Sequence, residues 1–576
     1  MNWEVRDMKL RTSFFNVRVL AKNLTRFAPL WILYAVGEVL GFMTLDLGEA
    51  TYRLVDDLSY IIGPVSIFHA GYALLVAVCL FGDLFDSRLC NGLHAMPMRR
   101  EGWLLTNLVS GLVFALIPAL VGGGFAAIVL EEYWWLAIAW QLISLLQFVF
   151  FFGVAVFSAM CAGKRLGMIA VYAMVNFFSV LIFWVADMLY EPLLPGVEFS
   201  EDWYERFSPL VTMVENRYYD IDITWSEIST KAVFNGFVPE SWYYLFICAG
   251  VGVVFTVLSW LLYSKRHLET AGDFISFRPM RMVFLIVYTI AAGVLVYAFG
   301  DFVGLYKDYG FLVVGILIGF FTGWMLLERT LKIFTKKVFV GFAAFAILFA
   351  GSLGITAWDP LQIAAYVPET EKIANVCLFQ LSDTFLYYSG THSGGWYITD
   401  PAEIAEVQAL HRQMLELPEN PNGEILNMEL RYELKNGNYV YRSYDVPAES
   451  PVAEDLRVFL SDPRAVFGTE DWQQVKDNLL QINIYFYGGD KLLEITDREQ
   501  MEAFLDAALA DCRAGTMAQH SYLHRYQEQV ASVDVTWRVP NAEGVNVDPN
   551  GARGEHLQIF EDCVNTAAFL ETLKKD

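Results

Sequence analysis

Long apolar runs separated by short polar segments fill the first 358 residues of the chain. The runs lie at about 27–45, 60–81, 103–129, 135–161, 166–189, 242–263, 282–299, 311–327 and 338–357. Each is close to the roughly 20 apolar residues with which an α-helix crosses the hydrocarbon core of a bilayer. The pattern therefore predicts an α-helical polytopic membrane protein with about nine transmembrane helices.

The segment before the first run is basic and amphipathic. Its charged and apolar side chains recur at helical spacing, and it lacks the short apolar core and small-residue cleavage site of a signal peptide. We therefore expect residues 1–26 to form a cytosolic interfacial helix that leads into the first span.

Residues 359–576 have the mixed pattern of an α+β domain. The clearest hairpin is 425–446, whose two segments are joined through Asn436 and Gly437, a pair typical of a type I′ turn. Helices are expected at about 401–417, 498–513 and 563–575.

This C-terminal domain contains a weak internal sequence repeat. Residues 397–414 and 494–511 both run from a strand through Thr-Asp into an amphipathic helix. Asp400 and Asp497, or the threonine before each, are expected N-caps, and the acids in the first turn suit the helix dipole. The repeat is explained either by a duplicated unit or by two unrelated capped helices, and both interpretations stay open.

Charge separates the two parts of the chain. The formal net charge is −24 although 55% of the residues are hydrophobic. From position 359 onward there are 36 acidic and 16 basic residues, a net of −20, so the acidity lies in the C-terminal domain. The apolar part is close to neutral.

The basic residues of the apolar part predict its orientation. With the N-terminus in the cytosol, cytosolic segments carry 19 Lys and Arg residues and the opposite loops carry five. Nine spans then place the C-terminal domain outside the cytosol. The expected organisation is a plasma-membrane protein with a transmembrane domain at 27–358, a cytosolic loop at 82–102, an external loop at 190–241 and an extracytoplasmic α+β domain at 359–576.

The cytosolic loop includes the sequence GDLFDSRLCNGLHAMPMRR at 82–100. If it is helical, its apolar side chains fall on one stripe, formed by Phe85, Leu89, Leu93 and Met96. Such a helix would lie along the membrane surface and offer a contact to a cytosolic partner. The alternative is a basic connector with no partner.

Motifs of known chemistry are absent from the sequence. It has no G-x-x-x-x-G-K-[ST], no H-E-x-x-H, no metal-spaced histidine cluster and no C-x-x-C. The external cysteines are Cys377, Cys512 and Cys563, which could form one disulfide or remain buried thiols. Nothing argues for an enzyme, a bound metal or a nucleic-acid partner.

One ionisable residue lies deep in an apolar run. Glu38 is expected to face a bundle interior, a partner or water, because a carboxylate in lipid is unfavourable. It is flanked by Gly37 and Gly41, a spacing that lets helices approach closely. The group could line a translocation path or dimer seam, or it could be a neutral carboxyl held between helices. In the third run, Pro118 and Gly122–Gly124 are expected to break the helix or form a re-entrant segment.

Two stretches carry a resemblance to a known family. Residues 87–112 resemble the cytosolic loop after the second span in ABC transporter permeases of the type-2 exporter class. Residues 262–277 resemble the Y-x-x-R-x-x-E-x-A-G pattern after the sixth span of Gram-positive members, here with Tyr263, Arg266, Glu269, Ala271 and Gly272. The resemblance covers roughly 1–270; the three further spans and the C-terminal domain depart from the six-span pattern.

The resemblance implies a transmembrane permease subunit of an ATP-driven exporter. Loop 82–102 would be the coupling loop on a separate ABC ATP-binding subunit, which would bind the ATP and Mg²⁺, and this chain would bind no cofactor. A second permease, identical or paralogous, would complete the pump, whose cargo is undefined. The implied coupling residues are Asp86, Arg88, Leu89, Leu93, His94, Met96, Pro97, Arg99, Arg100, Arg266, Glu269 and Gly272.

Two other function classes remain open. A membrane sensor would bind a ligand in its external domain, but the chain shows no recognisable cytosolic output domain. A secondary transporter is expected to show inverted repeats and buried charged pairs, of which Glu38 is the one hint.

Overall fold

The chain forms two compact units in the computed structural model. The structure describes residues 15–43, 51–94, 99–130, 134–199, 207–225, 232–239, 241–304, 309–380, 397–417, 424–467, 472–487, 492–518, 528–538 and 552–575. The first unit comprises Met1–Val185, Glu201–Thr224 and Ala232–Gly351. The second comprises Ala186–Ser200, Trp225–Lys231 and Ser352–Asp576.

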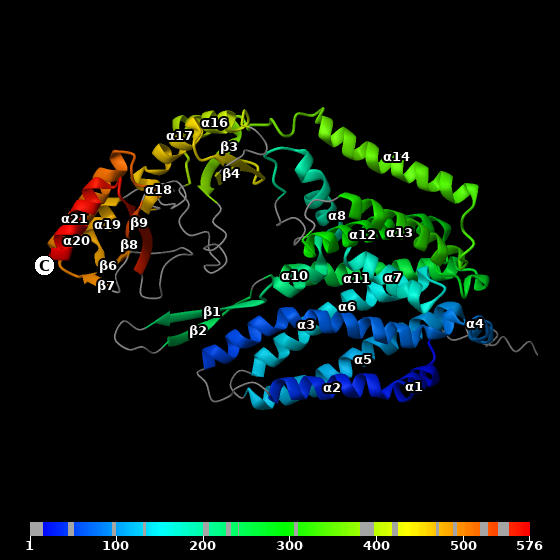
Figure 1. The fold of residues 1–576 in the computed structure, drawn as a ribbon. Coiled ribbons are helices and arrows are strands. Elements are labelled where there is room, and N and C mark those ends of the chain that lie inside the picture. Colours follow the sequence, from blue (N-terminus) through cyan, green and yellow to red (C-terminus); the bar gives the residue numbers. More distant parts are fainter. Residues whose placement is uncertain are drawn as a thin grey trace, which may run out of the picture. The chain divides into compact units, whose positions relative to one another are not determined.

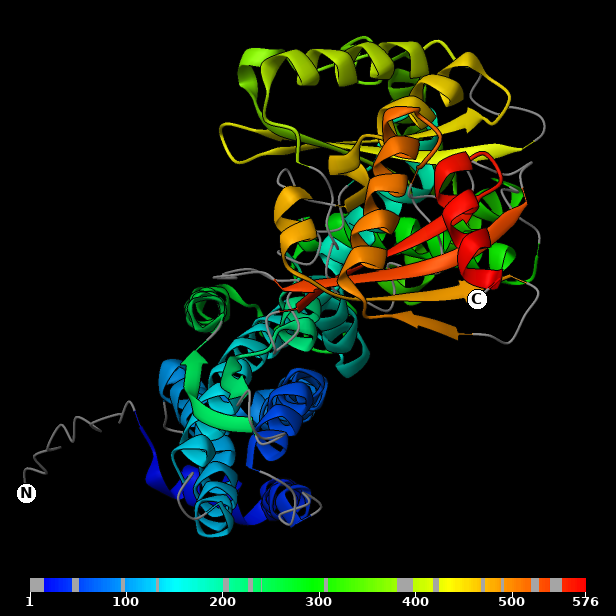
Figure 2. The same ribbon diagram turned by 90° about the vertical axis from the view of Figure 1, so that its left-hand side faces the viewer.

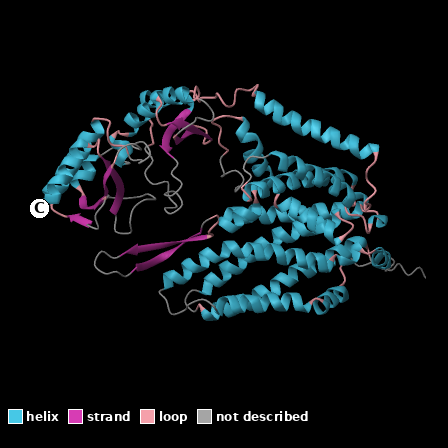
Figure 3. Cartoon of the chain, in the orientation of Figure 1, coloured by secondary structure: helices cyan, strands magenta, loops and turns pink. Residues whose placement is uncertain are grey.

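The first unit is a bundle of long helices (Figure 1, Figure 3). Its helices are α1 (Val17–Arg26), α2 (Ala28–Met43), α3 (Thr51–Leu80), α4 (Ser87–His94), α5 (Arg100–Val129), α6 (Trp134–Cys161), α7 (Arg165–Asn176), α8 (Phe178–Val185), α10 (Pro209–Glu215), α11 (Trp242–Lys265), α12 (Arg278–Phe302), α13 (Tyr309–Glu328) and α14 (Lys336–Trp358), the last of which ends in the second unit. A two-stranded hairpin, β1 (Tyr219–Trp225) with β2 (Ala232–Pro239), follows α10.

Seven of the described helices are long and apolar enough to cross a membrane, and nine spans result if each of two bent pairs counts as one. The bends are 62° between α1 and α2 and 60° between α7 and the helical segment that starts at Phe178. A helix therefore stands at each of the nine predicted runs, and the protein is a polytopic helical membrane protein. Of the predicted interfacial helix, residues 17–26 are helical as α1, and residues 1–14 lie outside the described part.

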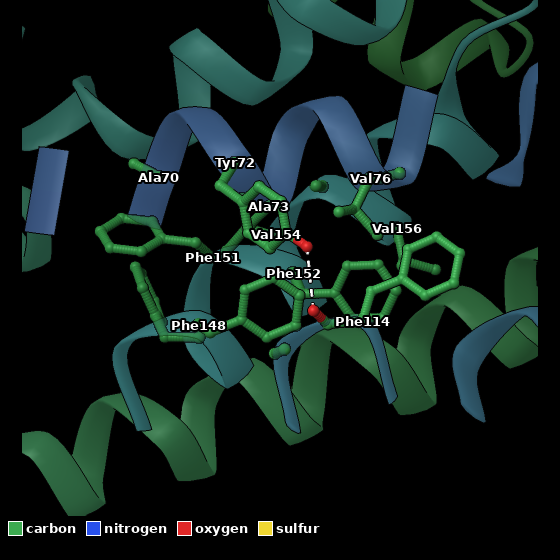
Figure 4. Packing of buried hydrophobic residues seen from close by; sticks show 14 of the residues in the cluster. Ala70, Tyr72, Ala73, Val76, Phe114, Phe148, Phe151, Phe152, Val154 and Val156 are labelled. Carbon is green, nitrogen blue, oxygen red and sulfur yellow. Dashed lines mark hydrogen bonds between the residues drawn. The ribbon is translucent and has the colours of Figure 1, made fainter. Parts of the chain in front are cut away.

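Aromatic and small side chains pack the centre of the bundle (Figure 4). The Tyr72 hydroxyl of α3 donates to the Phe114 carbonyl oxygen of α5 at 2.9 Å. On α6, Phe148 and Phe152 stack with their ring centroids 5.3 Å apart. Small residues on the facing helix, among them Ala70 and Ala73, leave room for these rings, so side chains interlock in this part of the bundle.

The prediction that α5 breaks at its proline and glycines is wrong. The helix runs from Arg100 to Val129 through Pro118 and the glycines. A Cβ on Gly122 would lie 2.7 Å from Cβ of Glu38, and one on Gly123 would lie 2.8 Å from Cγ of Gln141. The glycines therefore make room for neighbouring polar side chains, which a hydropathy pattern cannot reveal.

The second unit contains two antiparallel sheets. The three-stranded sheet has the order β3-β4-β5, with β3 (Ile373–Gln380), β4 (Ile425–Leu434) and β5 (Tyr439–Pro447). The four-stranded sheet has the order β7-β6-β8-β9, with β6 (Leu479–Phe486), β7 (Leu492–Ile495), β8 (Gln529–Arg538) and β9 (Ala552–Phe560). The predicted α+β pattern is present.

Helices pack on the apolar face of each sheet. They are α16 (Pro401–Met414), α17 (Pro451–Leu460), α18 (Pro463–Phe467), α19 (Trp472–Asp477), α20 (Arg498–Arg513) and α21 (Val564–Lys575). Figure 2 shows α20 and α21 on one face of the four-stranded sheet. On β8 the buried side chains alternate with partly exposed ones, as expected for a sheet with one covered face.

The predicted hairpin at 425–446 is confirmed, but its turn type is not I′. A type I′ turn needs positive φ at both central residues, and of Asn436 and Gly437 only the glycine has it, at +81°. The Gly437 amide donates to the Leu434 carbonyl, and the Leu434 amide donates to the Asn438 carbonyl. The connection is therefore a type I turn followed by a glycine bulge.

The two predicted N-caps are confirmed. The Asp400 carboxylate accepts from the amides of Ala402 and Glu403, and Asp497 accepts from those of Glu499 and Gln500. Each cap follows an extended segment at the edge of its sheet: Ile398 bridges to Val376 of β3, and β7 pairs with β6. Both sheets thus have the same order of elements and the same antiparallel neighbours, which favours the duplicated unit over two unrelated helices.

The second unit also includes residues that the sequence assigned elsewhere. Its C-terminal part begins at Ser352, close to the predicted boundary at 359. Ala186–Ser200, assigned from sequence mainly to the external loop at 190–241, belongs to it as well, because Val197 bridges to Arg442 and the Ser443 amide donates to the Gly196 carbonyl. All seven cysteines are free thiols, and no disulfide joins the three C-terminal ones.

Candidate functional site: the Arg266 platform

The connecting segment after α3 folds into two short helices rather than one. A single 3₁₀ turn, η1 (Gly82–Phe85), is followed by the extended residue Asp86 and then by α4. The Asp86 carboxylate accepts from the Arg88 and Leu89 amides at 2.8 and 3.2 Å and so caps α4. The predicted continuous stripe is therefore wrong, because Phe85 precedes the break.

Helix α4 presents a mixed surface to solvent. Arg88 is exposed, Leu89 is 53% exposed, and Cys90 is buried beneath them. The side chains of Leu93 and His94, and residues 95–98 with Met96 and Pro97, lie outside the described part. Arg99, the residue before α5, is exposed.

Arg266 connects this segment to the second motif. Its side chain is 5% exposed, and one terminal nitrogen donates to the Ala159 and Met160 carbonyls at 2.8 and 3.3 Å. The other donates to the Leu84 carbonyl of η1 at 3.3 Å. Burial lowers the pKa of Arg266, but arginine titrates so high that the side chain keeps its charge. We call the segments around it, 82–94, 99–103, 159–165 and 263–276, the Arg266 platform.

Aromatic contacts reinforce the platform. The Trp103 ring lies 5.6 Å from the Phe81 ring and 5.7 Å from the Tyr263 ring, measured between centroids. All three side chains are buried. The Arg100 side chain adds a long hydrogen bond of 3.5 Å to the Arg266 carbonyl. The ends of α3, α5 and α11 are therefore fixed to one another.

A short antiparallel pairing attaches the end of α6 to the segment after α11. The Gly272 amide donates to the Gly163 carbonyl, and the Ser276 amide donates to the Cys161 carbonyl, both at 2.8 Å. A Cβ on Gly163 would overlap the Thr270 carbonyl oxygen, and Gly272 has φ +97°, a conformation that favours glycine. Both glycines are thus required by the backbone geometry.

An ion-pair cluster lies next to this pairing. Asp273 contacts Arg281 at 2.9 Å and Arg329 at 3.3 Å, and each partner is partly exposed. Glu269 is exposed on the turn before it. Pairs of this kind contribute little stability each, about 0–1 kcal/mol.

The platform combines a fixed interior with a charged surface. Its interior is fixed by backbone acceptors and aromatic rings, and its surface carries the cations Arg88 and Arg99, the acids Asp86 and Glu269, and Leu89. No group of three His, Cys, Asp or Glu that could hold a metal occurs in the described residues. Of the predicted coupling residues described by the structure, Arg266 and Gly272 shape the platform, while Asp86, Arg88, Leu89, Arg99 and Glu269 lie on its surface.

Glu38 lies away from the platform, within the bundle. A carboxyl oxygen of Glu38 accepts from the Gln141 side-chain amide of α6 at 2.9 Å. Gly37 and Gly41 are exposed, with nothing in the described chain within 4 Å of an added Cβ. Glu38 therefore faces the bundle interior and the two glycines face outward, so the predicted site is divided between two surfaces of α2.

Sequence reasoning missed several residues that complete these sites. Gly163, Trp103 and Leu84 acquire their roles through backbone contacts and ring packing that no local motif encodes. Gln141 and Gln147 could have been found, because polar residues recur along one face of the otherwise apolar α6.

Comparison of the chain with protein-family models, with curated proteins and with solved structures gives no match.

Proposed function

We propose that this chain is the transmembrane permease subunit of an ATP-driven ABC exporter, and that a separate ATP-binding subunit docks on the Arg266 platform. The spans would form the membrane part of the pump, and ATP hydrolysis would occur on the partner chain. A second permease, identical or paralogous, would complete the assembly.

The observation that supports this proposal best is the position of Arg266. The family resemblance rests on two stretches, 87–112 and 262–277, and both contribute to the surroundings of Arg266. The Arg266 carbonyl accepts from the Arg100 side chain at 3.5 Å, and the Tyr263 ring lies 5.7 Å from the Trp103 ring, measured between centroids. Stretches that resembled the family by chance would have no reason to pack together. Their contact favours one docking surface composed of both.

The platform also suggests how movement would pass from an ATPase into the membrane. The ends of α3, α5, α6 and α11 meet at Arg266 and Trp103, so a partner that displaces α4 would move these helices together. A rigid-body change of this kind requires that the partner contacts differ between two states of the bundle.

The first experiment is gentle purification of the native complex, followed by mass identification of the accompanying chains. An ATP-binding subunit in stoichiometric amount is expected. In the double variant Arg88→Glu/Arg99→Glu, both reversed charges lie on the platform surface, and the ATP-binding subunit is expected to be lost.

The matched control is Lys332→Glu/Lys336→Glu, which reverses two exposed cations outside the platform. It is expected to retain the subunit. Equal retention by both variants would refute docking on the platform. A wild-type chain that purifies alone, without nucleotide hydrolysis, would count against the pump and favour a membrane sensor.

A further inference from the structure

Buried polar atoms without protein partners gather where α3 packs on α6. Four side-chain atoms in this region have no hydrogen-bond partner among the described residues: Ser66 Oγ, His69 Nε2, Gln141 Oε1 and Ser144 Oγ. Their side chains are at most 8% exposed. Buried polar groups nearly always have a partner, so this concentration needs an explanation.

Three of these residues, Ser66, His69 and Ser144, form one continuous cluster together with Gln147. Helices α3 and α6 both end at the Arg266 platform, since Arg266 contacts Leu84 just after α3 and Ala159 in the last turn of α6. The two helices are therefore parallel, and the His69 ring nitrogen Nδ1 lies 2.7 Å from Gln147 Oε1.

One turn earlier on the two helices stand Ser66 and Ser144, which parallel packing places level with each other. Both hydroxyls lack a protein partner, including the carbonyl of the preceding turn that the Ser158 hydroxyl of α6 uses. We name Ser66, His69, Ser144 and Gln147 the polar seam.

The polar seam extends to Glu38. Gln141 lies one turn before Ser144 on the same face of α6 and donates to a carboxyl oxygen of Glu38. From α2, Tyr34 lies edge-on to His69 with ring centroids 6.1 Å apart, one turn from Glu38. Titratable groups at the two ends of the seam are thus connected by a row of polar side chains.

The mixture of donors and acceptors defines the ligand. Because Nδ1 of His69 faces the Gln147 oxygen, it donates there and leaves Nε2 as an acceptor. The Gln147 nitrogen, whose neighbour is the Tyr218 hydroxyl, can only donate, and the two serine hydroxyls can do both. No cationic side chain contacts His69 or Glu38 among the described residues, where the other titratable neighbours are Tyr34, Tyr72 and Tyr218. Water meets this set of requirements, since each molecule donates and accepts.

We propose that the polar seam binds a cluster of internal water molecules that joins His69 to Glu38 and lets a proton pass between them. The transfer is balanced: the Glu38 carboxylic acid gives its proton to a bound water, and a water proton passes to His69 Nε2. Glu38 becomes a carboxylate and His69 an imidazolium. Chains of Glu, His and water recur in membrane proton relays. This inference goes beyond the exporter proposal and does not depend on it.

Water-edited solid-state NMR on the full-length protein in lipid bilayers, with ¹⁵N-labelled histidine, tests the hydration directly. Two other histidines of the chain serve as the dry and the hydrated reference for the rate of polarisation transfer from water. His411 is fully buried, and Tyr432 and Tyr444 hydrogen-bond its two ring nitrogens, whereas His267 is exposed. Histidine→Gln variants assign the signals. Polarisation from water is expected to reach His69 several-fold faster than His411, and a His69 signal as slow as that of His411 would overturn the proposal.

The proton link has its own measurement. In Glu38→Gln the ¹⁵N signal of His69 is expected to change its pH midpoint, because the proton donor is gone while the polar contacts remain. A midpoint equal to that of the wild type would refute the link to Glu38, even if the seam is hydrated.

Ser144→Ala provides a test that needs no histidine variant. If the Ser144 hydroxyl holds water, its removal lowers the melting temperature and slows water transfer to His69. If the hydroxyl is buried dry, its removal relieves an unsatisfied group and raises the melting temperature. Ser158→Ala is the matched control, since that hydroxyl is equally buried and donates to the Val154 carbonyl at 2.8 Å.

Discussion

At the scale of single residues, buried polar groups with specific partners determine much of the structure. His411 of α16 lies between the Tyr432 and Tyr444 hydroxyls, at 3.0 and 2.8 Å. Burial, followed by the nearby Arg442 and Arg412, lowers the pKa of His411 to about 3 from its ordinary 6.5. The imidazole therefore stays neutral in the folded domain at physiological pH.

This shift makes the C-terminal domain sensitive to acid. Below about pH 6.5 His411 is protonated in the unfolded chain but stays neutral in the folded domain. The free energy of unfolding is therefore highest above pH 6.5 and decreases as the pH falls toward 3. Between about pH 7 and pH 5 the loss is about 2 kcal/mol. Hydrogen exchange of the β4 and β5 amides measures it, and His411→Gln is expected to reduce the dependence. An equal dependence in the variant would contradict this account.

Glu429 of β4 has the opposite effect. Burial, together with the Glu198 carboxylate, raises the pKa of Glu429 to about 7 from its ordinary 4.5. The pKa of the Glu429 carboxyl is thus higher in the folded domain than in the unfolded chain. Its contribution to the free energy of unfolding is fully present below about pH 4.5 and is lost as the pH rises through 7. Glu429→Gln is expected to stabilise β4 and β5 at about pH 8 and to leave them unchanged at about pH 4. A stabilisation equal at both pH values would show that the carboxyl does not titrate in this range.

Arg266 is the residue on which the platform most depends. Arg266→Lys retains the charge, but a single ammonium group cannot reach the Leu84, Ala159 and Met160 carbonyls together. We expect a loss of about 1–3 kcal/mol in the free energy of unfolding. Thermal unfolding of the purified chain measures this loss, with the exposed neighbour Lys265→Ala as control. A variant as stable as the control would show that the buried contacts are dispensable.

At the scale of elements, close backbone approach fixes the contact between the end of α6 and the segment after α11. Gly163→Ala is expected to separate residues 161–163 from 272–276, because the new methyl group would overlap the Thr270 carbonyl. The readouts are thermal stability and retention of the proposed ATP-binding subunit, both expected to fall.

Gly250→Ala is the control for that substitution. Gly250 lies within α11, and an added Cβ there has no neighbour within 4 Å. Alanine in an open helical position is expected to be neutral or stabilising by up to about 1 kcal/mol. If both alanines behaved alike, the pairing at Gly163 would not be a tight contact.

At the scale of the whole molecule, the charge distribution predicts the topology. Nineteen of the 24 basic residues before position 359 fall in segments that nine spans place on one side. An alkaline phosphatase fused after residue 576 should be active, and a green fluorescent protein at the same position should remain dark. A fluorescent C-terminal fusion would imply an even number of spans.

Regular patterns of apolar and polar residues within single segments made much of the fold predictable from sequence. Apolar runs near 20 residues correspond to the helices, alternating residues to the β4–β5 hairpin, and Thr-Asp steps to the caps of α16 and α20. These features depend on interactions among neighbours in the chain, so the local sequence contains the information. The turn at Gly437 and the continuous α5 were mispredicted because backbone torsions and packing decided them.

The candidate sites divide in the same way. The sequence by itself determined a helical membrane protein, an acidic α+β domain, the basic segments and the isolated Glu38. Only the tertiary structure decided that Arg266 lies against Leu84, that Gly37 and Gly41 face away from Glu38, and that Ser66, His69, Ser144 and Gln147 come together. The physical reason is that a side chain acquires its partners when helices distant in sequence pack, and a period within one helix reveals a polar face but not what faces it.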